Sequence, residues 1–182
     1  MVITHPDRFY EKGDPGLTEE GMKRLGEILV PLRIIIGTKF VHIAHGTGQR
    51  FLSVYKFFQE HLYGTTGGIT RTASLFLGAP DANLKNSKDR ILASGDFVQG
   101  NEYLGLTKST CFSPWIHLWE LLKIADSKLA RVLLVFGGGE FTNHLLKDAG
   151  LIKELKSAEG QVYEVDFVKQ LVRLTEVPKS AV

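Results

Sequence analysis

The feature that most constrains the fold is a short segment, Arg131 to Phe136, which is followed directly by three glycines, Gly137 to Gly139. Its last five residues are all apolar, and a run of this kind is typical of a strand that is buried on both faces. Phe141, Leu145 and Leu146 then follow at helical spacing. The order of strand, glycine turn and helix predicts an α/β fold in which helices cover both faces of a sheet.

The same order recurs in the first third of the chain. Val2 to Thr4 is a short apolar segment and Lys39 to Ala44 lies between glycines, so we predict a strand at each place. A first helix is predicted to begin after Thr18, a favourable N-cap, and to end near Pro31, which cannot donate a helical hydrogen bond. Apolar residues at helical spacing predict a second helix: Phe51, Val54, Tyr55, Phe58 and Leu62.

The last third adds one helix before the apolar strand and two strands at the end. Ser113 as N-cap and Pro114 at the first helical position predict the start of that helix. Gln161 to Val168 and Leu171 to Thr175 are predicted to pair as edge strands of a hairpin. Together the elements predict one domain over residues 1–182, a three-layer α/β/α sandwich around a mostly parallel sheet.

Residues 65–110 form an insertion with the least regular pattern of the chain. Weak strand patterns appear at residues 73–77 and 90–93. The composition of this insertion is compatible with a lid, a dimer contact or an additional sheet edge. These three alternatives remain open at the level of the sequence, and so does the oligomeric state.

Composition and charge exclude several classes of protein. Hydrophobic residues make up 43% of the chain, which is enough to form a core and excludes wholesale disorder. The formal net charge of +2 lacks the basic excess of a dedicated nucleic-acid binder. The single cysteine, Cys111, excludes an internal disulfide and fits a reducing compartment. No secretory signal or membrane-length apolar run is visible, so we expect a cytoplasmic protein with no membrane partner.

Polar residues that bind anions follow three of the predicted strands. His5 and Arg8 follow the first strand, and His45 and Arg50 follow the second. Gly137 and Gly138 follow the third, at the start of a helix. Ligands of open α/β sheets bind beyond the carboxyl ends of the strands, where arginines and the N-termini of helices hold phosphate groups. The sequence therefore predicts a pocket for a phosphorylated small molecule or an inorganic anion.

The order of these motifs resembles the histidine phosphatase, or phosphoglycerate mutase-like, superfamily. The most specific match is the stretch Leu17 to Gly21 (Leu-Thr-Glu-Glu-Gly), which stands before the first helix. The likeness covers about half of the chain, Val2 to Leu62 and Ser113 to Gly150. It implies a phosphoglycerate mutase-like fold and hydrolysis of a phosphomonoester through a phosphohistidine, without a cofactor. His5 falls at the position of the nucleophile and Arg50 at that of a phosphate-clamping arginine.

The chain departs from the family pattern at three positions. Thr4 stands where the family has its first arginine, Pro6 where it has a glycine, and Gly137 where it has a second histidine. Loss of one preorganised donor typically lowers a rate by about 10² to 10³, so two unreplaced losses would leave very little turnover. Arg8 and His45 are the candidates to replace them.

The family also uses a carboxylate to protonate the leaving group. Asp96 and Glu102 in the insertion and Asp7 after the first strand are the candidates, although no motif positions them.

Two other functions remain open. The domain could be an inactive pseudophosphatase, which binds a ligand or a protein partner without turnover, because Gly137 lacks an imidazole. A weaker alternative is nucleotide binding at the turn of residues 137–139, which has neither the dinucleotide fingerprint nor the lysine of a P-loop. A tight strand-to-helix turn is the structural explanation of the same glycines.

Other histidines and aromatic residues are expected to serve the fold. His42 alternates with apolar neighbours and is expected in the core, and no histidine pair has metal-ligand spacing, so no metal is expected. Trp115 and Trp119 stand one helical turn apart and are expected to pack on the sheet.

Overall fold

The computed structural model describes residues 1–4, 16–74, 77–78, 113–151 and 160–177. Within these ranges strands and helices follow one another along the chain in mixed order. They are β1 (Val2–Thr4), α1 (Glu19–Ile36), β2 (Phe40–His45), α2 (Gln49–Leu62), β3 (Gly68–Ala73), α5 (Pro114–Ser127), β4 (Val132–Gly137), α6 (Gly139–Asp148), β5 (Val162–Asp166) and β6 (Leu171–Thr175).

The strands of the described ranges form one six-stranded sheet in the order β3-β2-β4-β1-β5-β6. The four strands from β3 to β1 are parallel, whereas β5 runs antiparallel to both of its neighbours. The carboxyl ends of the parallel strands therefore lie along one edge of the sheet. The register places Thr4 opposite Gly137, and His45 opposite both Phe136 and Ala73.

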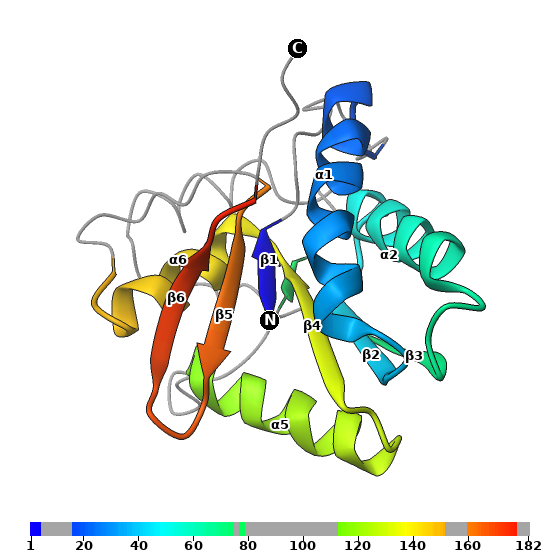
Figure 1. Ribbon diagram of the computed structural model, residues 1–182. Coiled ribbons are helices and arrows are strands. Elements are labelled where there is room, and N and C mark those ends of the chain that lie inside the picture. The colour runs from blue at the N-terminus through cyan, green and yellow to red at the C-terminus, as the bar shows by residue number, and fades with distance from the viewer. Residues whose placement is uncertain (5–15, 75–76, 79–112, 152–159, 178–182) are drawn as a thin grey trace.

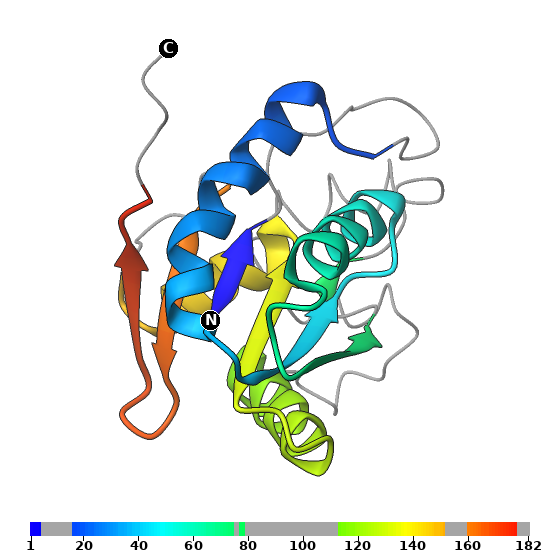
Figure 2. The same ribbon diagram turned by 45° about the vertical axis from the view of Figure 1, so that its right-hand side comes forward.

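Helices cover the sheet on both sides, which confirms the predicted three-layer α/β/α sandwich (Figures 1 and 2). On one face, α1 and α2 pack against strand residues such as Ile3, Leu134 and Phe136. On the other face, α5 and α6 pack against strand residues such as Val2 and Val135. Successive residues of β1 and β4 thus enter opposite cores, so β4 is buried on both faces as its apolar run predicts.

The first helix confirms its predicted start and corrects its predicted end. Thr18 caps α1, because its side-chain oxygen accepts a hydrogen bond of 3.0 Å from the backbone N–H of Gly21. The helix then continues through Pro31 and ends at Gly37, which has a φ of +53°. Leu32 and Ile36 are buried beyond the proline, and this burial offsets the hydrogen bond that the proline removes. Burial of side chains in the core therefore determines where α1 ends, in place of the local effect of Pro31.

The start of the insertion forms an edge of the sheet. β3 pairs with β2 in parallel over its whole length and has no strand on its other side in the described ranges. Of the three alternatives for residues 65–110, an additional sheet edge thus holds for Gly68–Ala73. The strand predicted at residues 73–77 was wrong, because the pairing begins at Gly68 and ends at Ala73. The strand predicted at residues 90–93 lies outside the described residues.

The two tryptophans of α5 differ in their surroundings. Trp115 is 9% exposed and packs into the core on the α5 and α6 face of the sheet, as predicted. Trp119 is 49% exposed and stacks on Phe167, with ring centroids 5.3 Å apart. Phe167 lies between β5 and β6, which form the predicted hairpin, but only β6 is an edge strand because β5 also pairs with β1. Trp119 thus packs on the end of this hairpin, which corrects the expectation that it faces the sheet.

None of the helices in the described ranges combines the length and hydrophobicity that crossing a bilayer requires.

We predict that Phe58→Ala lowers the free energy of unfolding by about 3 to 5 kcal/mol, as is usual for a fully buried aromatic side chain. Phe58 is 0% exposed and its ring lies 4.9 Å from that of Phe136, between α2 and the central strand. Urea denaturation followed by circular dichroism measures the change. Val30→Ala is the control, because Val30 is 65% exposed and should change stability by less than about 0.5 kcal/mol. Equal effects of the two substitutions would contradict the assignment of the core.

Candidate functional site

The candidate site lies at the sheet edge where the parallel strands end. Adjacent strands are roughly 4.8 Å apart, so the ends of β3, β2, β4 and β1 span only about 15 Å. Of the residues predicted there, His45, Arg50, Gly137 and Gly138 lie in the described ranges. His5, Arg8, Asp7, Asp96 and Glu102 lie outside the described residues.

His45 is the last residue of β2 and is 4% exposed. Its Nδ1 atom lies 2.6 Å from the carbonyl oxygen of Gly46, and its ring stacks on Tyr55 of α2 with centroids 5.3 Å apart. A carbonyl oxygen only accepts hydrogen bonds, so Nδ1 carries a proton and the neutral ring has its lone pair on Nε2. This Nε2 atom is buried and has no hydrogen-bond partner in the described ranges.

The surroundings of His45 favour the neutral imidazole. Burial lowers its pKa and is the largest influence, whereas the hydrogen bond to Gly46 opposes it. The positive charge of Arg71 lowers the pKa further. At neutral pH, His45 therefore presents Nε2 as a hydrogen-bond acceptor, and an arriving anion would raise the pKa and convert Nε2 to a donor.

Arg50 brings a buried positive charge to the same edge. It is the second residue of α2, is 4% exposed, and its guanidinium carbon lies 4.5 Å from the centroid of the Phe51 ring. A helix N-terminus already carries partial positive charge, and Arg50 adds a cation to the first turn of α2. A negatively charged ligand at this end of α2 would interact favourably with both the guanidinium and the helix.

A backbone crossing closes part of the edge between β2 and β4. The N–H of Thr47 donates to the carbonyl oxygen of Gly78 at 2.7 Å, and the N–H of Gly138 donates to that of Leu77 at 2.6 Å. A Cβ at Gly46 would lie 2.5 Å from the Phe51 ring, so only glycine allows this approach. The N–H of Gly138 is therefore already hydrogen-bonded and is not available to bind a phosphate group in the turn of residues 137–139.

Gly137 has little room for a side chain. A Cβ there would lie 3.0 Å from Cδ1 of Phe141 and 3.2 Å from Oγ1 of Thr142, which are both buried in α6. Side chains of α6 are therefore tightly packed around the position where the family resemblance implies a histidine. Oγ1 of Thr142 is itself buried and has no hydrogen-bond partner in the described ranges.

Thr4 serves the sheet. Its Oγ1 accepts a hydrogen bond of 2.8 Å from the N–H of Gln161, and its own N–H donates to the carbonyl oxygen of Gln161 at 3.0 Å. These bonds attach the end of β1 to the start of β5. Thr4 therefore has a structural role at the position where the resemblance implies a phosphate-binding arginine.

Sequence reasoning missed Arg71 and Tyr55 as neighbours of His45. Arg71, on β3, places its guanidinium carbon 4.8 Å from the centroid of the Tyr55 ring, and Tyr55 in turn stacks on His45. Side chains alternate between the two faces of a strand, and Arg71 stands two residues after the apolar Ile69. A correct placement of β3 would therefore have put both side chains on the same face of the sheet, the one that α2 covers.

Sequence reasoning also missed a hydroxyl–imidazole pair at the end of β3. Oγ of Ser74 lies 3.1 Å from Nε2 of His117 on α5, and burial lowers the pKa of His117 to about 4. A pKa so far below neutrality makes this imidazole a weak general base, so the pair is better suited to holding α5 on the sheet. His42 is likewise satisfied in the core, as predicted, with its ring nitrogens 2.8 and 3.1 Å from the hydroxyls of Thr70 and Thr72.

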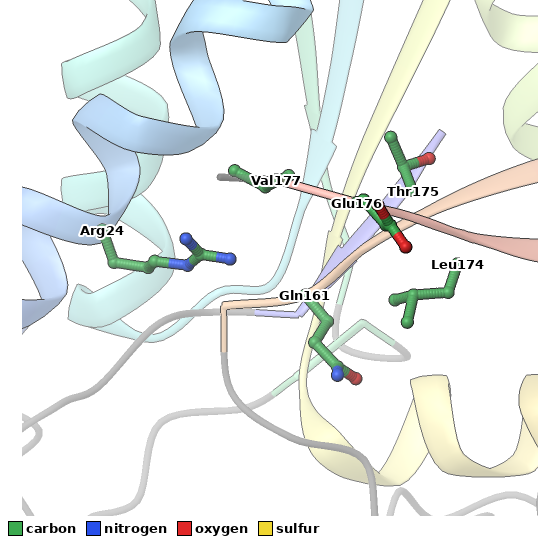
Figure 3. Close-up of a pocket in the computed structure, with 6 residues that line it drawn as sticks. All are labelled: Arg24, Gln161, Leu174, Thr175, Glu176 and Val177. Carbon is green, nitrogen blue, oxygen red and sulfur yellow. The ribbon is translucent and has the colours of Figure 1, made fainter. Parts of the chain in front are cut away.

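A cavity of about 370 Å³ lies at the other flank of the same edge (Figure 3). Its walls come from α1 and from the ends of β5 and β6: Arg24, Gln161, Leu174, Thr175, Glu176 and Val177. Two strands, β4 and β1, separate β2 and its histidine from β5. No group of three or more His, Cys, Asp or Glu side chains in the described ranges is placed to hold a metal ion.

The chain matches no protein-family model and no curated protein sequence. A crystal structure of a phosphoserine phosphatase mutant from Entamoeba histolytica, in complex with phosphoserine, is similar with a TM-score of 0.47 and 11% sequence identity. The similarity covers 96% of this chain and 93% of that chain.

We predict that His117 makes stability depend on pH. The pKa of His117 is about 4 in the folded chain, whereas an exposed histidine has a pKa of 6.5. Between pH 4 and 6.5 the imidazole is therefore protonated in the unfolded chain and neutral in the folded one. The free energy of unfolding should therefore fall as the pH decreases from 7 to 4, by on the order of 3 kcal/mol from this residue. Urea denaturation at pH 7 and pH 4.5 should show a smaller loss for His117→Gln than for the wild type. Identical pH dependence of the two proteins would contradict the assignment.

Proposed function

We propose that the chain is a divergent histidine-phosphatase-like domain that binds the phosphoryl group of a small molecule where β2 meets α2. The observation that carries this proposal is that two buried polar side chains stand within a stretch of six residues at this edge. His45 ends β2 and Arg50 lies in the first turn of α2, and each is 4% exposed.

The start of α2 suits an anion better than the start of α1. Thr18 caps α1 with its side chain, and Glu19 and Glu20 add negative charge to its first turn. In α2 the N-cap is Gly48, which has no side chain, and the first turn contains Arg50 and no acidic residue. The first turn of α2 thus adds positive charge to the helix start, which suits the binding of a phosphoryl group.

Unpartnered polar atoms at the edge support a ligand. Nε2 of His45 and Oγ1 of Thr142 are buried without a hydrogen-bond partner in the described ranges, and such atoms are rare because each costs about 1 to 3 kcal/mol. An oxygen atom of a phosphoryl group could accept from a protonated His45. The family resemblance supports the same assignment for Arg50, which falls at a phosphate-clamping position.

A second candidate function is hydrolysis of the bound phosphomonoester. It is favoured by the chain path, because His5 follows Thr4 directly and Thr4 ends β1 at the same edge as His45. In this scheme a nitrogen of His5 bonds to phosphorus while the bond to the leaving oxygen breaks, and an acid protonates that oxygen. Water then cleaves the nitrogen–phosphorus bond. Arg8 would clamp the phosphoryl oxygens, and Asp96 or Glu102 would act as the acid.

The packing at Gly137 favours binding without efficient turnover. A Cβ at Gly137 would already contact Phe141 and Thr142 tightly, so His45 is the described candidate to supply a second imidazole. If His45 does not do so, the domain is a pseudophosphatase that recognises a phosphorylated ligand or presents a surface to a protein partner.

We predict that inorganic phosphate binds saturably and that Arg50→Gln and His45→Asn each weaken binding by about tenfold or more, because each removes a charge-assisted hydrogen bond. Isothermal titration calorimetry at low ionic strength measures the dissociation constants. Lys56→Gln is the matched control, because Lys56 is an exposed cation on the same helix. Circular dichroism establishes that each variant is folded. Equal binding by Lys56→Gln and Arg50→Gln would sink the proposal.

For the second candidate we predict that the chain releases phosphate from an aryl phosphate and that His5→Ala abolishes this release. The assay runs from about pH 4.5 to 8, which spans the titration of carboxylates and histidines. Phosphate binding that survives in a protein without turnover would establish the pseudophosphatase. Turnover that is unchanged in His5→Ala would exclude His5 as the nucleophile.

A further inference from the structure

The cavity beside α1 has the features of a second small-molecule site. It measures about 370 Å³, within the usual size range of ligand pockets, and lies between α1 and the ends of β5 and β6. Figure 3 shows Arg24 reaching from α1 towards the strand ends, with Gln161, Leu174 and Glu176 on the other side. Because β4 and β1 lie between β2 and β5, this cavity is distinct from the site at His45.

Arg24 is held in place by two contacts on its own side of the cavity. Its Nε donates to the carbonyl oxygen of Gly160 at 3.1 Å, and its Nη1 donates to the Glu27 carboxylate at 2.6 Å. No hydrogen bond of Nη2 occurs within the described ranges, and the side chain is only 20% exposed. A guanidinium that is already immobilised loses little side-chain entropy when it binds a carboxylate.

The opposite wall offers an acceptor, a donor and an apolar surface. Glu176 is exposed and forms no ion pair within the described ranges. The side-chain oxygen of Gln161 accepts a hydrogen bond from the Tyr163 hydroxyl, which leaves its amide nitrogen as a donor. Leu174, 54% exposed, and the partly buried Val177 supply aliphatic surface.

The balance of charge selects the class of ligand. Among the described residues that line the cavity, Arg24 carries a positive charge and Glu176 a negative one. A simple anion would be attracted by Arg24 and repelled by Glu176, and a simple cation would experience the reverse. A ligand that carries both a negative and a positive charge would interact favourably with Arg24 and with Glu176.

From this arrangement we infer that the cavity binds a small zwitterion with an aliphatic side chain, of the class of free α-amino acids. Its carboxylate would accept from Nη2 of Arg24 and its ammonium group would donate to Glu176. Its side chain would contact Leu174 and Val177. The inference does not depend on phosphate binding at His45 and Arg50.

L-Leucine is the probe, and two analogues each lack one of its charges. 4-Methylpentanoate has the carboxylate without the ammonium group, and 3-methylbutylamine has the ammonium group without the carboxylate. We expect the full chain to bind L-leucine saturably in calorimetry, and each analogue at least about tenfold more weakly. Absence of saturable leucine binding, or equal binding of either analogue, would overturn the inference.

Two substitutions connect binding to the cavity. Glu176→Gln should weaken leucine binding about tenfold without disturbing the contacts that hold Arg24, and Arg24→Gln should weaken it at least as much. Lys23→Gln is the matched control, because Lys23 is the exposed neighbour of Arg24 on the same helix. Leucine affinity that is unchanged in Glu176→Gln would also overturn the inference. Phosphate affinity measured on the same variants should stay constant, which separates this site from that at Arg50.

Discussion

The pairing of β4 with both β2 and β1 holds the molecule together. β2 and β3 follow one another in the chain and pair on one side of β4, whereas β1, β5 and β6 lie on the other side. Hydrogen bonds from β4 join these two parts into one sheet, and its side chains enter both cores. Without β4 the two helical layers would have no common surface, and the ends of β1 and β2 would no longer lie at one edge.

Much of this architecture could be predicted because hydrophobic burial and turn residues leave clear local patterns. The apolar run of β4, the glycines around β2 and the stripe of α2 each predicted the correct element. The end of α1 could not be predicted, because Pro31 is a local stop signal and the burial of Ile36 is a tertiary effect. β3 was misplaced for a similar reason, since its partner strand determines where it begins.

The candidate site divides in the same way. His45 and Arg50 were identified from their place after a strand, a rule that depends only on the direction of the chain. The closed packing at Gly137 and the role of Thr4 were invisible, because they depend on Phe141, Thr142 and Gln161 from other elements. The cavity at Arg24 was missed for the same reason, since α1 and the last hairpin are distant in sequence. A sequence indicates which residues reach an edge, and the packing decides which of them remain available there.

The carbonyl groups of Leu77 and Gly78 engage two backbone donors at the carboxyl edge of the sheet. They accept from the N–H groups of Gly138 and Thr47, which lie in the two glycine turns at the carboxyl edge. An anion that used either N–H would have to displace a peptide carbonyl, at a cost of about 1 kcal/mol for each exchanged bond. The two carbonyl groups would thus compete with any ligand for these N–H groups. Binding of any ligand that used either N–H would therefore be thermodynamically linked to release of residues 77–78, and whatever loosens that crossing would raise the affinity for such a ligand.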